Sequence, residues 1–194
     1  MLGVERDKVS LAPHNNDWAK EFQRTKDELL AVLGDDLVEV RHVGSTAVKG
    51  IVAKPILDAA IVIKSMQSHH VAGMEAAGYE FCGEQEPGRY LFVKRRNGSI
   101  STHHIHCYLE NQENFKSTVS FCEFLNEHPA YAKQYNDLKV ELALKYPDNK
   151  GAYADGKAAF IEMVIDLAKR SAAPRCLPQS AELTAPSTGR SLGV

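Results

Sequence analysis

The chain has 194 residues, of which 44% are hydrophobic and 25% are charged, and its 23 Lys and Arg against 25 Asp and Glu leave a formal charge of −2. This length fits one globular domain whose core is large enough to fold without disulfides or a structural metal. The near-neutral balance provides no overall positive field, which disfavours duplex DNA as a partner. Any phosphate therefore has to be held by a local cluster of cations and backbone N–H groups.

The cysteines and the N-terminal residues indicate a reducing, intracellular setting. The cysteines form no CxxC pair or zinc-ligand spacing, which predicts free thiols at Cys82, Cys107, Cys122 and Cys176. Residues 5–8 are all charged where a signal peptide needs apolar residues, and no run reaches the ~18 apolar residues of a membrane span. We therefore expect a cytoplasmic protein that does not associate with a membrane.

The first third of the chain predicts one helix and two strands. Residues 16–33 have a rough apolar stripe, begin at a capping asparagine and stop at Gly34, which predicts a helix. Residues 37–43 are typical of a short strand that ends at Gly44. Residues 55–63 are apolar apart from one aspartate, which predicts a strand covered on both faces at the centre of the sheet.

The remainder predicts more sheet and then helices alone. A helix is expected over residues 65–77, followed by strands over residues 79–82, 90–96 and 102–109, with turns at Pro87-Gly88 and Asn97-Gly98. From residue 111 the apolar period becomes helical, which predicts three helices around residues 115–125, 131–146 and 153–169. This order predicts an α+β fold in which a mixed sheet packs against helices and the C-terminal part is helical.

The composition changes near residue 170. Residues 1–170 form the predicted domain, whereas residues 171–194 are rich in Ser, Ala and Pro and contain no aromatic residue. Such a segment buries too little surface to offset the entropy that is lost when it becomes ordered. We therefore expect a disordered C-terminal tail.

Asp58 is the strongest single signal for a functional site. A carboxylate inside an otherwise apolar strand costs several kcal/mol unless a cation or hydrogen-bond donors meet it. Two interpretations stay open at this point. Asp58 is either a buried aspartate that pairs with one arginine or caps a loop, or a metal-binding or catalytic carboxylate at the active edge of the sheet.

The second signal is the turn Gly44-Ser45-Thr46, which follows a predicted strand. Its backbone N–H groups and the start of a helical turn point at one place and suit a phosphate, although the same pattern is also an ordinary helix cap. Twelve residues separate Ser45 from Asp58, enough for the chain to return beside the first strand. The turn and the carboxylate would then share an edge.

The third signal is the histidine-rich strand. With a period of two, His104 and His106 point to one face, and His103 points to the other. Two imidazoles separated by one residue suit a metal site or proton transfer. His42, two residues before Gly44, is placed to join them from the neighbouring strand.

Basic residues around these motifs are candidates for contacts with an anionic ligand. The predicted phosphate or substrate set consists of His42, Gly44, Ser45, Thr46, Lys54, Arg89, Lys94 and Lys157. The alternative is that these cations are solvated surface charges. Strand alternation puts Lys94 on the face opposite Arg95, so only part of the hairpin cluster faces any one site.

Several spaced motifs together resemble the GrpB-like family of small bacterial and fungal proteins. They are residues 11–15, residues 42–48 with 54–58, residues 103–106, and residues 146–148 with Tyr153 and Lys157, and the resemblance covers about residues 9–168. That family is placed in the nucleotidyltransferase superfamily with the DNA polymerase beta-like fold. The resemblance therefore implies a nucleotidyltransferase-like mixed sheet, with Gly44 and Ser45 in the phosphate-binding turn and Asp58 as the first carboxylate.

The match is incomplete at the remaining carboxylates. Members of the superfamily carry a second acidic residue one residue after the first, and here that position is Ala60. In place of a third carboxylate, the later strand offers His104 and His106. One aspartate with two imidazoles supplies less negative charge than the carboxylates that hold two cations about 4 Å apart. The predicted metal is therefore one divalent ion, Mg, Mn or Zn, held by Asp58, His104 and His106.

Three functions remain open from the sequence. The first is metal-dependent transfer of a nucleotidyl or phosphoryl group from a nucleotide or phosphorylated small molecule, with Asp58, His104 and His106 as catalytic residues. The second is a transition-metal-dependent hydrolase or lyase that uses the same three residues on a small acidic metabolite. The third is a non-catalytic module that binds a nucleotide-like ligand or a partner protein.

Overall fold

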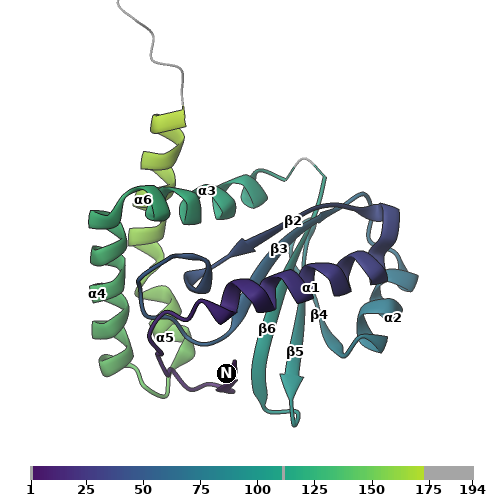
Figure 1. Cartoon of the computed structure of the whole chain (residues 1–194), viewed down its shortest axis with the longest axis horizontal. Coiled ribbons are helices and arrows are strands. Elements are labelled where there is room, and N and C mark those ends of the chain that lie inside the picture. Colours follow the sequence, from purple (N-terminus) through teal and green to yellow (C-terminus); the bar gives the residue numbers. More distant parts are fainter. Residues whose placement is uncertain (1, 111, 173–194) are drawn as a thin grey trace, which may run out of the picture.

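Six strands form one mixed sheet in the computed structural model, which describes residues 2–110 and 112–172 (Figure 1). The longer strands lie in the order β2-β3-β6-β5-β4, and the short β1 pairs with the start of β6. Strands β3 and β6 run parallel, and the other pairs run antiparallel. The strands are β1 (Val4–Glu5), β2 (Leu37–Val43), β3 (Leu57–Ile63), β4 (Tyr79–Glu86), β5 (Arg89–Arg96) and β6 (Ile100–Leu109).

The predicted position of one strand is wrong. The sequence placed the apolar strand β3 at the centre of the sheet, but β6 occupies that position and β3 lies between β6 and the edge strand β2. Apolar residues on both sides of a strand report that both faces are covered, and a strand next to the edge satisfies that condition as well as a central one. The composition of β3 is therefore explained by the helices above and below it.

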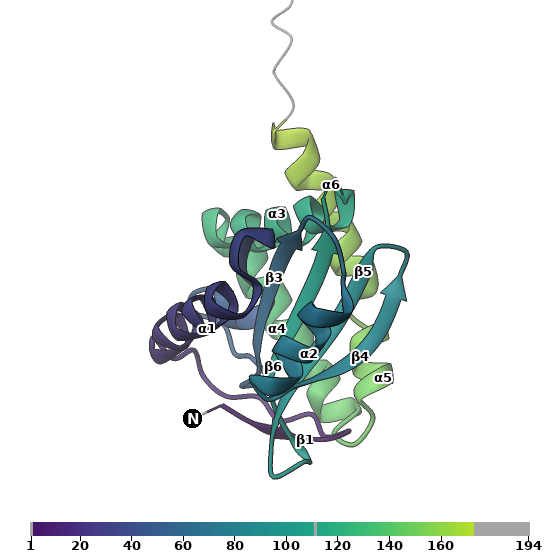
Figure 2. The ribbon, with the colours of Figure 1, turned by 90° about the vertical axis from the view of Figure 1, so that its right-hand side faces the viewer.

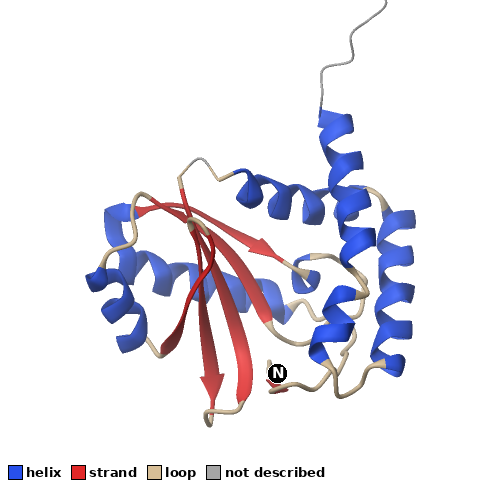
Figure 3. Ribbon diagram, turned by 180° about the vertical axis from the view of Figure 1, so that it is seen from behind, coloured by secondary structure: helices blue, strands red, loops and turns tan. Residues whose placement is uncertain are grey.

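Helices cover both faces of the sheet (Figure 2). Helices α1 (Asp17–Leu33) and α2 (Ser68–Ala76) pack on one face. On the opposite face the core includes α3 (Glu113–Glu127), α4 (Pro129–Lys145) and α6 (Ala158–Ala172), and these helices stand beside the sheet when it is seen from behind (Figure 3). The remaining helical segments are η1 (Gly34–Asp36), η2 (Ser45–Ala47) and α5 (Lys150–Asp155).

Alternation along β3 divides the core into two parts. The odd-numbered residues from Leu57 to Ile63 pack with α1 and α2, whereas Ala60 and Val62 pack with α3, α4 and α6. Asp58 alternates with its neighbours and so belongs to the second face. The predicted α+β fold, with a mixed sheet packed against helices and a helical C-terminal part, is confirmed.

The predicted elements differ from the observed ones mainly at their ends. Helix α2 begins at Ser68 rather than near residue 65, and the last predicted helix is interrupted at Gly156 and Lys157 to give α5 and α6. Strand β1 was not predicted, because two residues are too short to show a period. The Asn97-Gly98 turn is confirmed, with φ angles of 52° and 71° that suit a tight hairpin.

The C-terminal prediction is tested over two residues. Helix α6 ends at Ala172, so residues 171 and 172 of the predicted tail are helical, and residues 173–194 lie outside the described residues. Within the described part, Cys82, Cys107 and Cys122 are free thiols, as predicted, and Cys176 lies outside it. The same part contains no helix that is both long and apolar enough to cross a bilayer.

Candidate functional site

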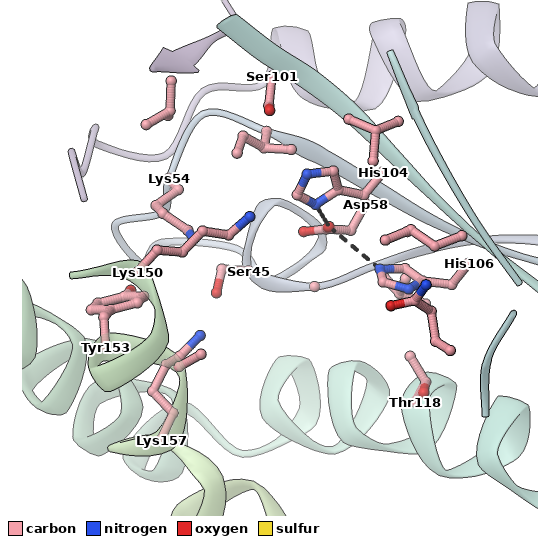
Figure 4. A pocket seen from close by; sticks show the side chains of 18 of the residues that line it. Ser45, Lys54, Asp58, Ser101, His104, His106, Thr118, Lys150, Tyr153 and Lys157 are labelled. Atoms are coloured by element: carbon pink, nitrogen blue, oxygen red, sulfur yellow. Dashed lines mark hydrogen bonds and ion pairs between the residues drawn. The ribbon is translucent and has the colours of Figure 1, made fainter. Parts of the chain in front are cut away.

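A pocket of about 890 Å³ lies on the sheet face that is turned toward the C-terminal helices (Figure 4). This volume falls within the ~300–1,000 Å³ that is usual for small-molecule sites. Eight residues of the predicted site line it: Gly44, Ser45, Lys54, Asp58, Arg89, His104, His106 and Lys157. The turn, the aspartate and the paired histidines, which are far apart in the sequence, thus meet in one place.

Gly44 allows the turn to lie directly against Asp58. Antiparallel pairing sets Val43 opposite Asp58, and Gly44 then turns the chain with a φ of 70°. A Cβ on Gly44 would stand 2.4 Å from Oδ2 of Asp58 and 2.9 Å from its Cγ. Neither the backbone angle nor the space accepts a side chain here. The turn and the carboxylate therefore share one edge, as their spacing predicts.

Asp58 meets both imidazoles that β6 presents to the pocket. Parallel pairing sets Asp58 opposite His104 and Ala60 opposite His106. Oδ1 of Asp58 lies 3.2 Å from Nδ1 of His104 and 3.7 Å from Nε2 of His106. Burial by itself would raise the pKa of Asp58, but the hydrogen bonds and charges of the two histidines outweigh it and hold that pKa well below its usual range. Asp58 is therefore ionised, and its partners belong to the pocket rather than to a remote arginine.

A cluster of lysines lies across the pocket from Asp58. The ammonium groups of Lys54 and Lys157 lie 5.2 Å and 4.6 Å from the centre of the Tyr153 ring, and Lys150 lies near them (Figure 4). Burial and the charges of Lys157 and Lys150 lower the pKa of Lys54 to about 8. Burial also lowers the pKa of Lys157. Burial is the main cause of both shifts, and the negative charge of Asp58 acts in the opposite direction on both lysines.

The overall charge of the pocket is positive. Seven Lys and Arg line it, namely Arg6, Lys8, Lys54, Arg89, Arg95, Lys150 and Lys157, against three acids, Glu5, Asp7 and Asp58. Three of the cations already have carboxylate partners, since Lys8 pairs with Asp148, Arg89 with Glu86 and Arg95 with Glu80. In the part of the chain that the structure describes, Arg6, Lys54, Lys150 and Lys157 have no carboxylate at ion-pairing distance.

Sequence reasoning missed several of these lining residues. Arg6 and Lys8 come from the N-terminal segment, which β1 attaches to β6 through the pairing of Val4 with Ser101. No local pattern indicates that contact. Arg95 had a usable signal, because alternation already separated it from Lys94, but nothing in the sequence told which face of the hairpin carries the pocket.

Lys139 is a buried cation behind the pocket that the sequence reasoning also missed. Its side chain is fully buried, its Nζ donates a hydrogen bond to the carbonyl oxygen of Val52, and it lies 4.8 Å from the centre of the Tyr135 ring. Burial, followed by the charge of Lys157, lowers the pKa of Lys139 to about 7. The available signal is its spacing from Tyr135 and Leu142, which puts it on the buried stripe of α4.

Three predicted site residues do not line the pocket. His42 and Thr46 lie behind the turn, where His42 Nε2 and Thr46 Oγ1 are 3.0 Å apart and the His42 ring stacks on Phe22 of α1. Burial lowers the pKa of His42 to about 4, so its ring is neutral near pH 7. Both residues therefore hold the turn from the far side of the sheet, and their placement among the phosphate contacts is corrected.

Lys94 is the third predicted site residue that does not line the pocket. It lies opposite His103 on the sheet face that packs against α1, and its Nζ is 2.7 Å from Oε1 of Glu28. The predicted hairpin cluster is indeed divided between two faces, but the half that lines the pocket carries Arg95 instead of Lys94. Lys94 belongs to a structural ion pair.

The three predicted metal ligands do not fit one ion as they lie. Bonds of about 2.0–2.1 Å to zinc keep any two ligand atoms within roughly 4.2 Å of each other. Among the described residues, the set of three whose ligand atoms all lie within 4.8 Å of one another is Asp36, His69 and His70, not Asp58, His104 and His106. Both imidazoles approach the same carboxylate oxygen from different sides, and the rings are 6.4 Å apart.

The cluster of Asp36, His69 and His70 has a structural explanation. Nδ1 of His70 accepts a hydrogen bond from the backbone N–H of Gln67 at the start of α2, which requires the proton of a neutral ring to be on Nε2. Nε2 lies 3.1 Å from Oδ2 of Asp36 and donates to it. Both ring nitrogens are in use, so His70 joins the helix start to η1 and offers no free lone pair to a metal.

Comparison with known proteins assigns the family. The family described as GrpB protein matches residues 8–166. The chain belongs to the GrpB family. Among the family's members, it is 30% identical over 172 residues to the glutamate-rich protein GrpB of Alkalihalophilus pseudofirmus, covering 86% of this chain and 99% of that protein. It is 35% identical over 166 residues to the UPF0157 protein YqkA of Bacillus subtilis, and this match spans about half of that relative, 48% of its length against 84% of this chain.

A solved GrpB structure agrees with this assignment to the GrpB family. The crystal structure of the conserved protein GrpB from Enterococcus faecalis superimposes with a TM-score of 0.77 at 30% identity, over 84% of this chain and 98% of that one. A structure of the Cid1 poly(U) polymerase with Mg 3′-dATP bound is a distant match, with a TM-score of 0.49 at 15% identity, over 74% of this chain and 49% of that one. The GrpB resemblance drawn from the sequence is thereby confirmed.

Proposed function

We propose that this GrpB-family protein binds a nucleotide or another phosphorylated small molecule in the pocket and transfers a phosphoryl or nucleotidyl group from it. The observation that carries the proposal is the meeting, in one pocket, of the Gly44-Ser45 turn and a group of lysines that have no carboxylate at ion-pairing distance among the described residues. Backbone N–H groups at such a turn and nearby ammonium groups are the donors that phosphate oxygens require.

The chemistry expected of this set is electrostatic. Charge that develops on a transferred phosphoryl group is stabilised by fixed donors and cations, and Ser45, Lys54 and Lys157 line the pocket at one end. His106 and His104 line the other end, where an imidazole can exchange a proton with a leaving or attacking oxygen. The predicted divalent ion at Asp58, His104 and His106 is not part of the proposal, because those three donors do not converge.

We propose a small phosphorylated ligand rather than duplex DNA. The formal charge of the chain is −2, and the unpaired lysines that the structure describes in this site gather inside one pocket instead of along an exposed stripe. We keep a cytoplasmic location as part of the proposal.

A second candidate is the non-catalytic binding module. Ala60 favours it, because the residue opposite His106 on the pocket face of the sheet carries no functional group. The two candidates share the ligand and differ in turnover. Product formation from a radiolabelled nucleoside triphosphate, with and without an acceptor nucleotide, supports transfer, and tight binding with no turnover supports the module.

Ligand binding, which both candidates share, is tested with ATP and the full chain. Binding is measured by calorimetry and by the shift in melting temperature. We expect binding by the native protein and a loss of at least tenfold in affinity for Lys157→Met. Lys64→Met is the matched control, since Lys64 is exposed and does not line the pocket. Equal affinity in the two variants would place the ligand elsewhere and contradict the proposal.

A further inference from the structure

We infer that the pocket binds its phosphorylated ligand without a divalent metal ion, and that Lys54, Lys150 and Lys157 supply the positive charge that a metal would otherwise bring. This inference rests on the proposed function, because it assumes that the ligand carries phosphate. It adds that the ligand is a polyphosphate or a similar polyanion, free of metal in its bound form.

Apart from Asp58, β3 and β6 present no carboxylate to the pocket. On the pocket face, β3 presents Asp58 and then Ala60, and β6 presents His104 and His106 in register with them. A pair of metal ions needs carboxylates that bridge cations about 4 Å apart, and Ala60 stands where one of them would be. The other acids lining the described pocket, Glu5 and Asp7, belong to the N-terminal segment rather than to β3 or β6.

The histidines already engage one oxygen of the remaining carboxylate. Oδ1 of Asp58 is 3.2 Å from His104 and 3.7 Å from His106, so both imidazoles converge on it. Oδ2 faces Gly44, so closely that a Cβ there would stand 2.4 Å away. Asp58 thus contacts both histidines through Oδ1 and packs against the turn, which leaves Oδ1 poorly placed to be a metal ligand.

The lysine cluster supplies charge of the sign that a polyphosphate needs. Lys54 and Lys157 approach the same Tyr153 ring, at 5.2 Å and 4.6 Å from its centre, and Lys150 lies beside them (Figure 4). Within the described residues, none of these three ammonium groups is at ion-pairing distance from a carboxylate. An anion between them would relieve their mutual repulsion, whereas a divalent cation would add to it.

The experiment asks whether Asp58→Asn weakens or strengthens the binding of a polyphosphate. If a metal at Asp58 bridges protein and phosphate, removing its charge abolishes binding. If the lysines bind the phosphate directly, removing the nearest negative charge leaves binding intact or strengthens it, by roughly two- to tenfold. The probes are ATP and inorganic tripolyphosphate, titrated calorimetrically into the full chain in EDTA and again in magnesium or manganese chloride.

We expect both probes to bind in EDTA at least as tightly as in magnesium, and Asp58→Asn to bind at least as tightly as the native protein. Binding that needs magnesium or manganese and is lost in Asp58→Asn overturns this inference and leaves the proposed function standing. An absence of binding under every condition overturns both. If Asp58→Asn does not fold, as judged by its melting transition, the comparison of EDTA with metal on the native chain decides alone.

Discussion

The two faces of the sheet each carry lysine against a tyrosine ring, and they differ in what neutralises it. On the α1 face, Lys94 lies 4.6 Å from the centre of the Tyr79 ring, and Glu28 accepts hydrogen bonds from both the Lys94 ammonium and the Tyr79 hydroxyl. On the pocket face, Lys157 lies at the same 4.6 Å from the centre of the Tyr153 ring, with Lys54 on that ring as well. No carboxylate of the described chain completes the second group.

This difference distinguishes the structural cation Lys94 from the lysines that we propose bind the ligand. A lysine beside an aromatic ring and a carboxylate is satisfied, and its contribution is to stability. Two lysines on one ring without a carboxylate repel each other, and burial lowers their pKa values. The fold keeps such an arrangement at a cost in stability, and the proposed anionic ligand would compensate for it.

The largest effect should come from Gly44→Ala, which adds a side chain where the turn meets Asp58 in the pocket. The new Cβ would collide with Asp58 at a residue with φ of 70°, so the free energy of unfolding should fall by about 3 kcal/mol. Gly50→Ala is the matched control, because Gly50 has φ of 74° but nothing lies within 4 Å of its Cβ position. We expect a loss of about 1 kcal/mol there. Equal losses in chemical denaturation would show that the contact with Asp58 is unimportant.

Removing the two lysines on the Tyr153 ring should abolish the difference between the faces. Lys54→Met with Lys157→Met should weaken the binding of ATP by about 100-fold, equivalent to about 2.7 kcal/mol, because two charge-assisted contacts are lost. Lys94→Met should leave the affinity within twofold, since Lys94 lies on the other face. Calorimetric titration measures both. A similar loss of affinity in Lys94→Met would show that the two faces do not differ in ligand binding.

The affinity should also fall as the pH rises. Lys54 has a pKa of about 8, so it is charged at pH 7 and largely neutral at pH 9 in the free protein. A phosphate with a second pKa near ~6 stays ionised over this range. We expect the affinity for ATP to fall by about tenfold from pH 7 to pH 9. Lys54→Met should flatten the profile, and an unchanged slope in that variant would assign the titration to another group.

The stability of the free protein should change with pH in the opposite direction. The pKa of Lys54 is lowered from its unfolded value of 10.5 to about 8, so the unfolded chain binds more protons between these values. The contribution of Lys54 to the free energy of unfolding therefore rises as the pH increases from 8 toward 10.5. The ligand-binding profile and the stability profile thus report the same lysine with opposite signs.

The smallest effect should come from Glu28→Gln, which removes the carboxylate that pairs with Lys94 on the α1 face. The variant should lose about 1 kcal/mol of stability, because the pair is partly exposed and a neutral amide still bonds Tyr79. The affinity for ATP should be unchanged. A change in affinity larger than threefold would mean that the two faces are coupled.

Part of the candidate site follows from local patterns. Asp58 was predicted because one acid interrupts an apolar strand, and the division of His104 and His106 from His103 follows from strand alternation. Gly44 was predicted from its place between a strand and a hydroxyl pair. Each of these signals lies within a few residues, so each is readable without the fold.

Other parts of the site depended on partners that are distant in the sequence. His42 and Thr46 carry the right chemistry but bond each other behind the turn, and Lys94 was chosen although its partner, Glu28, is 66 residues away. Alternation shows that two residues face opposite ways, but it does not tell which face will carry the pocket.

The sequence by itself determined the α+β class, the GrpB family, the helical C-terminal part and the acid that stands against the turn. Only the tertiary structure decided that β6 is central, that Arg95 lines the pocket instead of Lys94, and that the N-terminal segment reaches it. The reason is physical: periodicity and turn residues are set by neighbours along the chain, whereas strand order and the neutralisation of each charge are set by contacts between segments that meet only on folding.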